Sequence, residues 1–191
     1  GSSRAASATH SGGGGARQVQ RMAHSVLDIA AHVHSLPLWD DDPLEDETVQ
    51  AVTQLARLLS DTVGDAEEQA LVREVRQTGV IGPIIRLVSR HRDRTQFLYL
   101  GLSILVNLSD IGGADLVLLH RGADLLIEML PSEDANVAYY AVAGVQNLSC
   151  FPDCINLILD ARADEKLQCM LRDSASEHVQ RCTAGALANI R

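Results

Sequence analysis

The side chains best able to bind a metal are four cysteines in the last quarter of the chain, with His178 close to the last of them. They are Cys150, Cys154, Cys169 and Cys182. Cysteine zinc sites usually carry paired C-x₂-C ligands, but these cysteines are separated by 4, 15 and 13 residues. Cys169 and Cys182 also fall on the expected buried faces of helices. We therefore predict free thiols in a reducing compartment, with no bound metal or other cofactor.

A basic turn over residues 90–94, RHRDR, contains the His-Arg-Asp of a protein-kinase catalytic loop. The glycine-rich loop, the upstream lysine and the Asp-Phe-Gly that accompany it in kinases are missing from this sequence. Nucleophile elbows, phosphate loops and H-E-x-x-H zinc motifs are missing too. We predict that the protein is not an enzyme. Arg90, Arg92 and Arg94 are interpreted as a solvated turn, with contact to an anion or acidic peptide as the alternative.

A second charged segment begins with Asp40, Asp41 and Asp42 and runs to Glu47, beside Trp39. Acidic residues just before a helix interact favourably with the helix dipole. We interpret this segment as a solvated helix start. Docking of a basic partner, or folding back on the basic turn, is the alternative. Its spacing does not match a calcium-binding EF-hand loop.

The chain has 191 residues, of which 46% are hydrophobic and 3% aromatic, so it can bury an aliphatic core. Its 25 acidic residues outnumber the 16 basic ones and give a formal charge of −9. Proteins that bind a phosphate backbone are normally basic, so a nucleic-acid partner is disfavoured. No apolar run is long enough to predict a transmembrane segment, and no hydrophobic leader opens the sequence. We expect a cytoplasmic protein and leave nuclear or peripheral membrane association open.

Residues 1–16 are rich in Ser, Gly and Ala and are predicted to form a flexible tail. Apolar residues then follow the spacing of amphipathic helices from Arg17 to Pro37, over 44–63 and over 65–77. Gly79 is expected to cap the last of these. We interpret residues 17–63 as an N-terminal cap or degenerate repeat.

From residue 66 the sequence repeats with a period near 40. Asn107, Asn147 and Asn189 each lie near the end of an apolar helix, at intervals of 40 and 42 residues. An apolar position of the preceding helix recurs at intervals of 42 and 41, in Ile84, Leu126 and Leu167. We divide this region into three units, 66–110, 113–150 and 152–191.

A period near 40 with two or three helices per unit is typical of armadillo and HEAT solenoids. The local residues resemble the armadillo family. Residues 79–88, GVIGPIIRLV, are similar to its glycine-led second helix. Residues 141–149, AVAGVQNLS, and 184–190, AGALANI, are similar to the end of its third helix. The resemblance covers about two thirds of the chain and implies an all-α, right-handed α-solenoid.

In such a solenoid the third helices would line a concave groove, where the three asparagines would form a ladder. An amide both donates and accepts hydrogen bonds, so the ladder could bind the backbone of an extended peptide. The alternative is that each asparagine only ties one repeat to the next. The candidate groove residues are Ser103, Asn107, Tyr139, Ala143, Gln146, Asn147, Gly185 and Asn189, with Tyr139 chosen over Tyr140 as a guess.

The resemblance implies a non-enzymatic scaffold or adaptor that binds a segment of a partner protein. Nuclear-import receptors of this family carry a tryptophan four residues before the asparagine, where this sequence has Ser103, Ala143 and Gly185, so that role is disfavoured. A regulatory or targeting module of a larger enzyme, such as a ubiquitin ligase or a signalling protein, remains open. Self-association also remains open, because an uncapped last helix would expose Leu171, Leu187 and Ile190.

Overall fold

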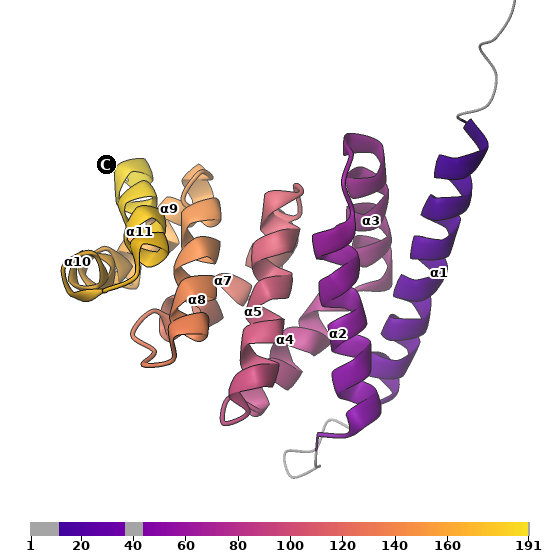
Figure 1. Cartoon of the computed structure of the whole chain (residues 1–191), viewed down its shortest axis with the longest axis horizontal. Coiled ribbons are helices and arrows are strands. Elements are labelled where there is room, and N and C mark those ends of the chain that lie inside the picture. The colour runs from indigo at the N-terminus through magenta and orange to yellow at the C-terminus, as the bar shows by residue number, and fades with distance from the viewer. Residues whose placement is uncertain (1–11, 37–43, 191) are drawn as a thin grey trace, which may run out of the picture.

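The computed structural model describes residues 12–36 and 44–190, and all regular structure in these ranges is α-helical (Figure 1). The helices are α1 (Gly12–Ser35), α2 (Asp46–Asp61), α3 (Asp65–Thr78), α4 (Ile81–Arg90), α5 (Thr95–Asp110), α6 (Ala114–Leu119), α7 (Gly122–Met129), α8 (Ala135–Leu148), α9 (Pro152–Asp160), α10 (Ala163–Asp173) and α11 (Glu177–Ile190). The expected tail falls partly outside the described residues, and α1 begins at Gly12 rather than at Arg17.

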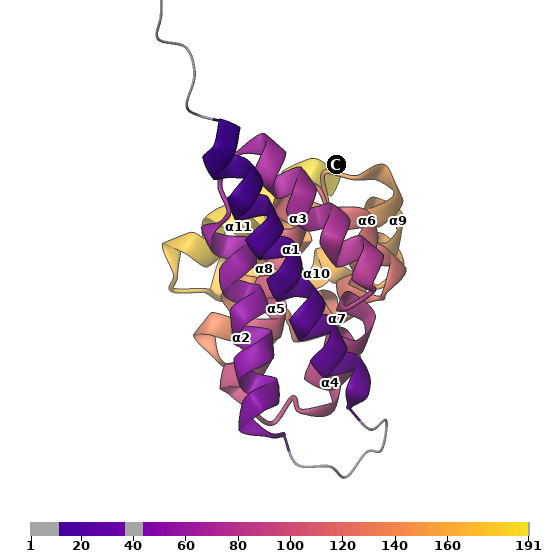
Figure 2. The ribbon, with the colours of Figure 1, turned by 90° about the vertical axis from the view of Figure 1, so that its right-hand side faces the viewer.

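The helices form a stack in which each unit packs on the next. The third helices α5, α8 and α11 lie side by side, and α2 extends this row at the N-terminal end. We call α2, α5, α8 and α11 the inner layer. Figure 2 looks along the stack and shows the inner layer on one side and the remaining helices on the other. The protein is therefore an all-α solenoid, and α2 continues the row of third helices at its N-terminal end.

The N-terminal cap is α1, which packs along α2 and α3. Its apolar stripe, from Met22 to Val33, is buried at the start of the core. Two histidines at its end bond to the next helices. The His34 ring donates to the Thr78 carbonyl oxygen at 2.9 Å, and the His32 ring lies 3.1 Å from the Thr48 hydroxyl. This cap shields the first stacking surface from water.

Each unit turns from its first to its second helix through a residue in the left-handed region. Gly79 (φ 62°) occupies this position in the first clear unit, as the sequence predicts, and Arg121 (φ 63°) and Arg162 (φ 52°) occupy it in the next two. A side chain there costs about 1–2 kcal/mol relative to glycine. Each arginine bonds to a carboxylate three residues ahead, Asp124 or Glu165, which offsets part of that cost.

The core is continuous and aliphatic, as expected for close helix stacking. Its largest fully buried side chains, apart from the α2 and α3 leucines, come from α4, α5, α7 and α8 and include Ile84, Leu102, Leu105, Leu126 and Leu148. Three glycines of the inner layer permit close crossings. A Cβ built on Gly101 would lie 2.4 Å from Val88, and one on Gly144 would lie 2.6 Å from Leu126, both inside a unit. A Cβ on Gly185 would lie 2.5 Å from Gln146 on α8, so this small residue lies between neighbouring repeats.

The outer helices of neighbouring units are joined by ion pairs. Arg76 on α3 donates two hydrogen bonds to Asp115 on α6, at 2.6 and 3.0 Å, and this holds the pKa of Asp115 below its ordinary value. Arg92 pairs with Glu128 on α7. Lys166 on α10 donates to the Ile127 carbonyl oxygen at 3.3 Å. These contacts fix neighbouring units in register on the side away from the inner layer.

We predict that Gly101→Ala lowers the free energy of unfolding by about 1–3 kcal/mol, because the stiff Val88 side chain cannot yield to a new methyl group. Chemical denaturation followed by circular dichroism measures this change. Gly185→Ala is the matched control. Its new Cβ meets only the flexible end of Gln146, and alanine is the better helix former by about 1 kcal/mol. Equal stability losses in both variants would contradict the close crossing.

Candidate functional site

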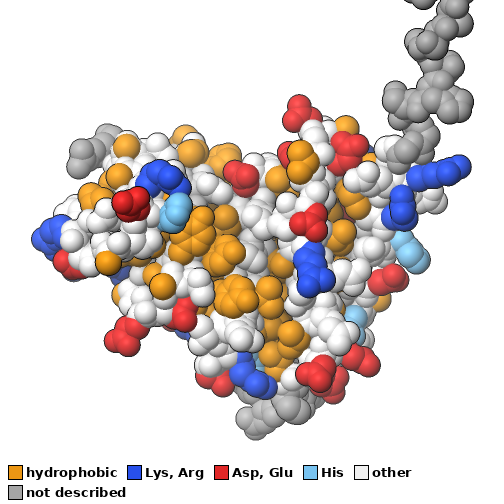
Figure 3. Space-filling model, viewed as in Figure 1, with side chains coloured by type: hydrophobic (Ala, Val, Ile, Leu, Met, Phe, Trp, Pro, Cys, Tyr) orange, Lys and Arg blue, Asp and Glu red, His pale blue; other side chains and the backbone are white. Residues whose placement is uncertain are grey.

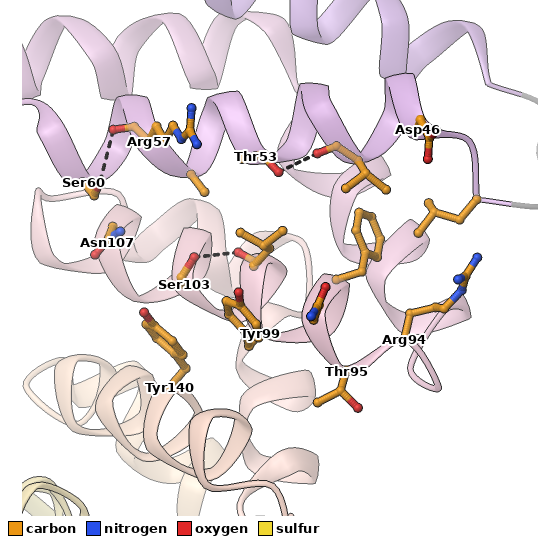
Figure 4. A pocket seen from close by; sticks show the side chains of 16 residues that line it. Asp46, Thr53, Arg57, Ser60, Arg94, Thr95, Tyr99, Ser103, Asn107 and Tyr140 are labelled. Carbon is orange, nitrogen blue, oxygen red and sulfur yellow. Dashed lines mark hydrogen bonds between the residues drawn. The ribbon is translucent and has the colours of Figure 1, made fainter.

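A groove of about 770 Å³ runs between α2, α5 and α8 on the inner layer (Figure 4). We call it the central groove. Its polar lining includes Arg57 from α2 and Ser103 and Asn107 from α5, while Tyr99 and Tyr140 supply aromatic surface. Figure 3 shows hydrophobic side chains gathered along the middle of this face. A pocket of this size, with apolar walls and a few polar groups, is typical of a binding site.

Aromatic side chains form a row across three successive helices of the inner layer. Tyr99 on α5 stacks on Tyr140 on α8, with ring centroids 6.1 Å apart and planes 10° apart. Tyr139 makes edge contacts with Tyr140 at 5.4 Å and with His178 on α11 at 6.4 Å. We call these four side chains the aromatic row. Tyr140 lines the central groove, and Tyr139, the residue expected there from the sequence, does not. The spacing of 41 residues between Tyr99 and Tyr140 matches the repeat period and could have identified this pair.

Two of the three candidate asparagines tie one unit to the next. The Asn147 amide donates to the Val106 carbonyl oxygen at 3.3 Å and to the Ser109 hydroxyl at 3.4 Å. The Asn189 amide donates to the Ser149 hydroxyl at 3.0 Å. Both donors therefore serve the tie between repeats, which was the alternative to peptide binding.

Asn107 is different. It is half-buried, it lines the central groove, and its side chain has no hydrogen-bond partner among the described residues. The Ser60 hydroxyl, near the end of α2, lies 3.2 Å from the Arg57 carbonyl oxygen and 2.9 Å from the Asp61 carboxylate, and no hydrogen bond joins it to Asn107. The tie that Asn147 and Asn189 form to a serine of the preceding unit is therefore absent at Asn107 among the described residues.

The remaining groove candidates are less accessible. Ser103 lines the central groove but donates its hydroxyl proton to the Leu100 carbonyl oxygen at 2.8 Å, so toward a ligand it offers only an acceptor. Ala143 is buried at 9% exposure. Gln146 and Gly185 lie against each other where α8 meets α11. None of the last three lines the central groove.

The charged residues proposed as contacts lie in different parts of the structure. Arg94 lines one end of the central groove together with Asp46. Arg92 is engaged with Glu128, and Arg90 lies beside a different pocket, near His32 at the end of α1. The acidic residues Asp40, Asp41 and Asp42 lie outside the described residues.

The thiols divide into two buried and two exposed groups. Cys154 and Cys182 are buried, and burial raises the pKa of both thiols, whereas Cys150 and Cys169 are exposed. The expectation that Cys169 faces the core is wrong. Ala163 and Leu167 are the fully buried residues of α10, and a residue two positions after Leu167 points to the opposite side of the helix. The part of the chain that is described contains no group of three metal-binding side chains.

The last unit is more covered than the sequence suggested. Leu187 is buried at 8% exposure and Ile190 packs partly against the core, so the expectation that they would be exposed is wrong. Leu187 faces inward because α11 packs against both α8 and α10. Leu171 is exposed, as expected. No helix in residues 12–36 or 44–190 is both long and apolar enough to cross a membrane.

No protein-family model and no curated protein matches this sequence. Solved structures match it in fold. A designed armadillo repeat protein in complex with the peptide (KR)4 has a TM-score of 0.65 at 17% identity, over 90% of this chain and 64% of that one. A structure of computationally designed armadillo repeat proteins for modular peptide recognition has a TM-score of 0.65 at 19% identity, over 91% of this chain and 76% of that one. An engineered protein has a TM-score of 0.58 at 19% identity, over 96% of this chain and 95% of that one.

These likenesses confirm the armadillo-type α-solenoid predicted from the sequence. The chain spans less than two thirds of the length of the first of these structures. At such low identities the likeness establishes the fold alone. What the protein binds therefore has to be argued from its own side chains.

We predict that Asn147→Ala lowers the free energy of unfolding by about 1–2 kcal/mol, because it removes the tie to Val106 and Ser109. Asn107→Ala, which removes no hydrogen bond to a described residue, is expected to stay within about 0.5 kcal/mol of the original protein. Urea denaturation of the two variants measures the difference. A larger loss for Asn107→Ala than for Asn147→Ala would contradict the assignment of the tie.

We also predict that only Cys150 and Cys169 react rapidly with a thiol reagent in the folded protein. The thiolate is the reactive form, and burial both raises the pKa of Cys154 and Cys182 and blocks access to them. Titration with a chromogenic disulfide at pH 8, before and after adding denaturant, counts each class. The double variant Cys150→Ser, Cys169→Ser should lose the fast phase entirely. A fast phase that survives would contradict this division.

Proposed function

We propose that the protein is a non-enzymatic scaffold that binds an extended segment of a partner protein in the central groove. The observation that carries this proposal is the Asn107 amide, which has no hydrogen-bond partner among the described residues and lies beside the stacked rings of Tyr99 and Tyr140. A polar group poised next to apolar surface in a groove is what a peptide backbone with a nonpolar side chain requires.

The chemistry of binding follows from the groove lining. The Asn107 amide can donate to a peptide carbonyl and accept from a peptide N–H, which holds an extended backbone without reading its sequence. The exposed edges of Tyr99 and Tyr140 would cover a nonpolar or aromatic side chain of the partner. Ser103 adds an acceptor nearby. Asn147 and Asn189 keep neighbouring units in register and so hold the groove in shape.

The fold neighbours support this proposal at the level of architecture. Two of them are described as designed for, or in complex with, a peptide. A role as an import receptor is not supported, since the positions four residues before the asparagines hold Ser103, Ala143 and Gly185 and provide no tryptophan.

The test is a selection of random 12-residue peptides on the immobilised protein, followed by affinity measurements. We predict that the selected peptides bind Asn107→Ala about tenfold more weakly, since a hydrogen bond contributes on the order of 1–1.5 kcal/mol. The matched control is Asn156→Ala, which changes an exposed asparagine on α9, away from the central groove. It should leave affinity unchanged.

Two outcomes would contradict the proposal. The selection could yield no peptide, or the selected peptides could bind Asn107→Ala and Asn156→Ala with equal affinity. Unfolding curves for both variants accompany the measurement, so that a loss of binding is not mistaken for a loss of fold.

A further inference from the structure

The charges of the inner layer have an unusual distribution. All five carboxylates of its helices lie in the first two or the last positions of a helix, at Asp46, Glu47, Asp61, Asp110 and Glu177. The only arginines on these helices, Arg57 and Arg181, lie inside them, and α8 carries no charged residue at all. In a chain of formal charge −9, the interior of this one layer carries only positive charge.

Four arginines on the outer side, Arg76, Arg92, Arg121 and Arg162, each pair with a carboxylate, while others on the outer helices, such as Arg73 and Arg86, have no ion pair among the described residues. Within the described residues, neither Arg57 nor Arg181 forms an ion pair. The guanidinium of Arg181 contacts only the His178 ring, at 3.0 Å. The inner layer therefore presents guanidinium groups that no carboxylate of the described chain neutralises.

The two arginines flank the aromatic row. Arg57 lines the central groove from α2, across from Asn107 and Tyr99 on α5, as Figure 4 shows. Arg181 lies at the other end of the row, through its contact with His178, which in turn meets the ring of Tyr139. Across α2, α5, α8 and α11 the surface thus runs from a cation through an amide and stacked tyrosines to a second cation.

We propose that the partner segment is acidic, with a carboxylate side chain bound by Arg57, a nonpolar or aromatic side chain over the aromatic row, and a second carboxylate toward Arg181. This inference rests on the proposed function and specifies the ligand. A guanidinium matches a carboxylate with two parallel hydrogen bonds. A basic segment would find no carboxylate between the ends of these helices.

One end of the groove does not contribute to this preference. Arg94 and Asp46 line that end together, so it offers both signs of charge. The selectivity for acidic side chains therefore depends on Arg57, which is the charged residue in the middle of the groove lining. This makes Arg57 the position at which the inference is most directly tested.

The experiment uses the peptides selected on the original protein from the random 12-residue library. They should be enriched in Asp and Glu flanking a nonpolar residue. Arg57→Glu should weaken their binding at least tenfold, and Arg57→Gln should weaken it less. Arg73→Glu is the matched control, because it makes the same change in net charge at an exposed site on α3 outside the groove. It should change affinity less than twofold. Peptides in which Lys replaces the acidic residues should bind Arg57→Glu better than the original protein.

The outcomes separate this inference from the proposed function. Peptides that depend on Asn107 but are neutral or basic, or that bind Arg57→Glu and Arg73→Glu equally, would overturn the acidic segment while leaving peptide binding intact. A selection without any peptide that depends on Asn107 would overturn both. Single-stranded oligo(dT), added as a competitor, tests the other anionic ligand that stacked aromatics and arginine could bind. Tighter, Arg57-dependent binding of this oligonucleotide would also overturn the inference.

Discussion

The whole structure depends on lateral packing between neighbouring units. A pair or triplet of short helices cannot bury its apolar face alone, so each unit is stable only against the next. The inner layer shows this most clearly, because α2, α5, α8 and α11 pack in succession from one end of the molecule to the other. Gly101 and Gly144 let the second helix of a unit approach its third. The groove lies between neighbouring helices of this inner layer.

The proposed binding surface lies where one tie between units is absent. Asn147 and Asn189 are bonded to the preceding unit, whereas Asn107 forms no such bond to α2 among the described residues. At the junction between α2 and α5, the Asn107 side chain therefore has no hydrogen-bond partner among the described residues. The same junction borders the stacked Tyr99 and Tyr140. Irregularity in the first unit, rather than the regular ladder, places the candidate site.

Charge is separated between the two sides of the solenoid. Ion pairs between units, such as Arg76 with Asp115, lie on the outer helices and join one unit to the next. The arginines inside the inner-layer helices have no carboxylate partner in the described structure, and Arg57 lines the central groove while Arg181 lies beside His178 on α11. Net charge alone would have favoured a basic ligand for this chain. The local arrangement supports the opposite preference, because a bound side chain responds to the nearest groups far more than to distant, screened ones.

Much of the architecture could be predicted from the sequence alone. The period near 40, the αL glycine at Gly79 and the amphipathic helices determined an all-α solenoid of the armadillo type, because local helix patterning and repeated stacking are written in residue spacing. Residue spacing does not determine which hydrogen-bond partner a side chain finds. Tertiary structure alone decided that Asn147 is tied and Asn107 is available, that Tyr140 rather than Tyr139 lines the groove, and that Cys169 is exposed while Leu187 is buried. The physical reason is that a helix rotation of a few tens of degrees, set by packing against the neighbouring unit, decides which of two adjacent side chains meets a partner.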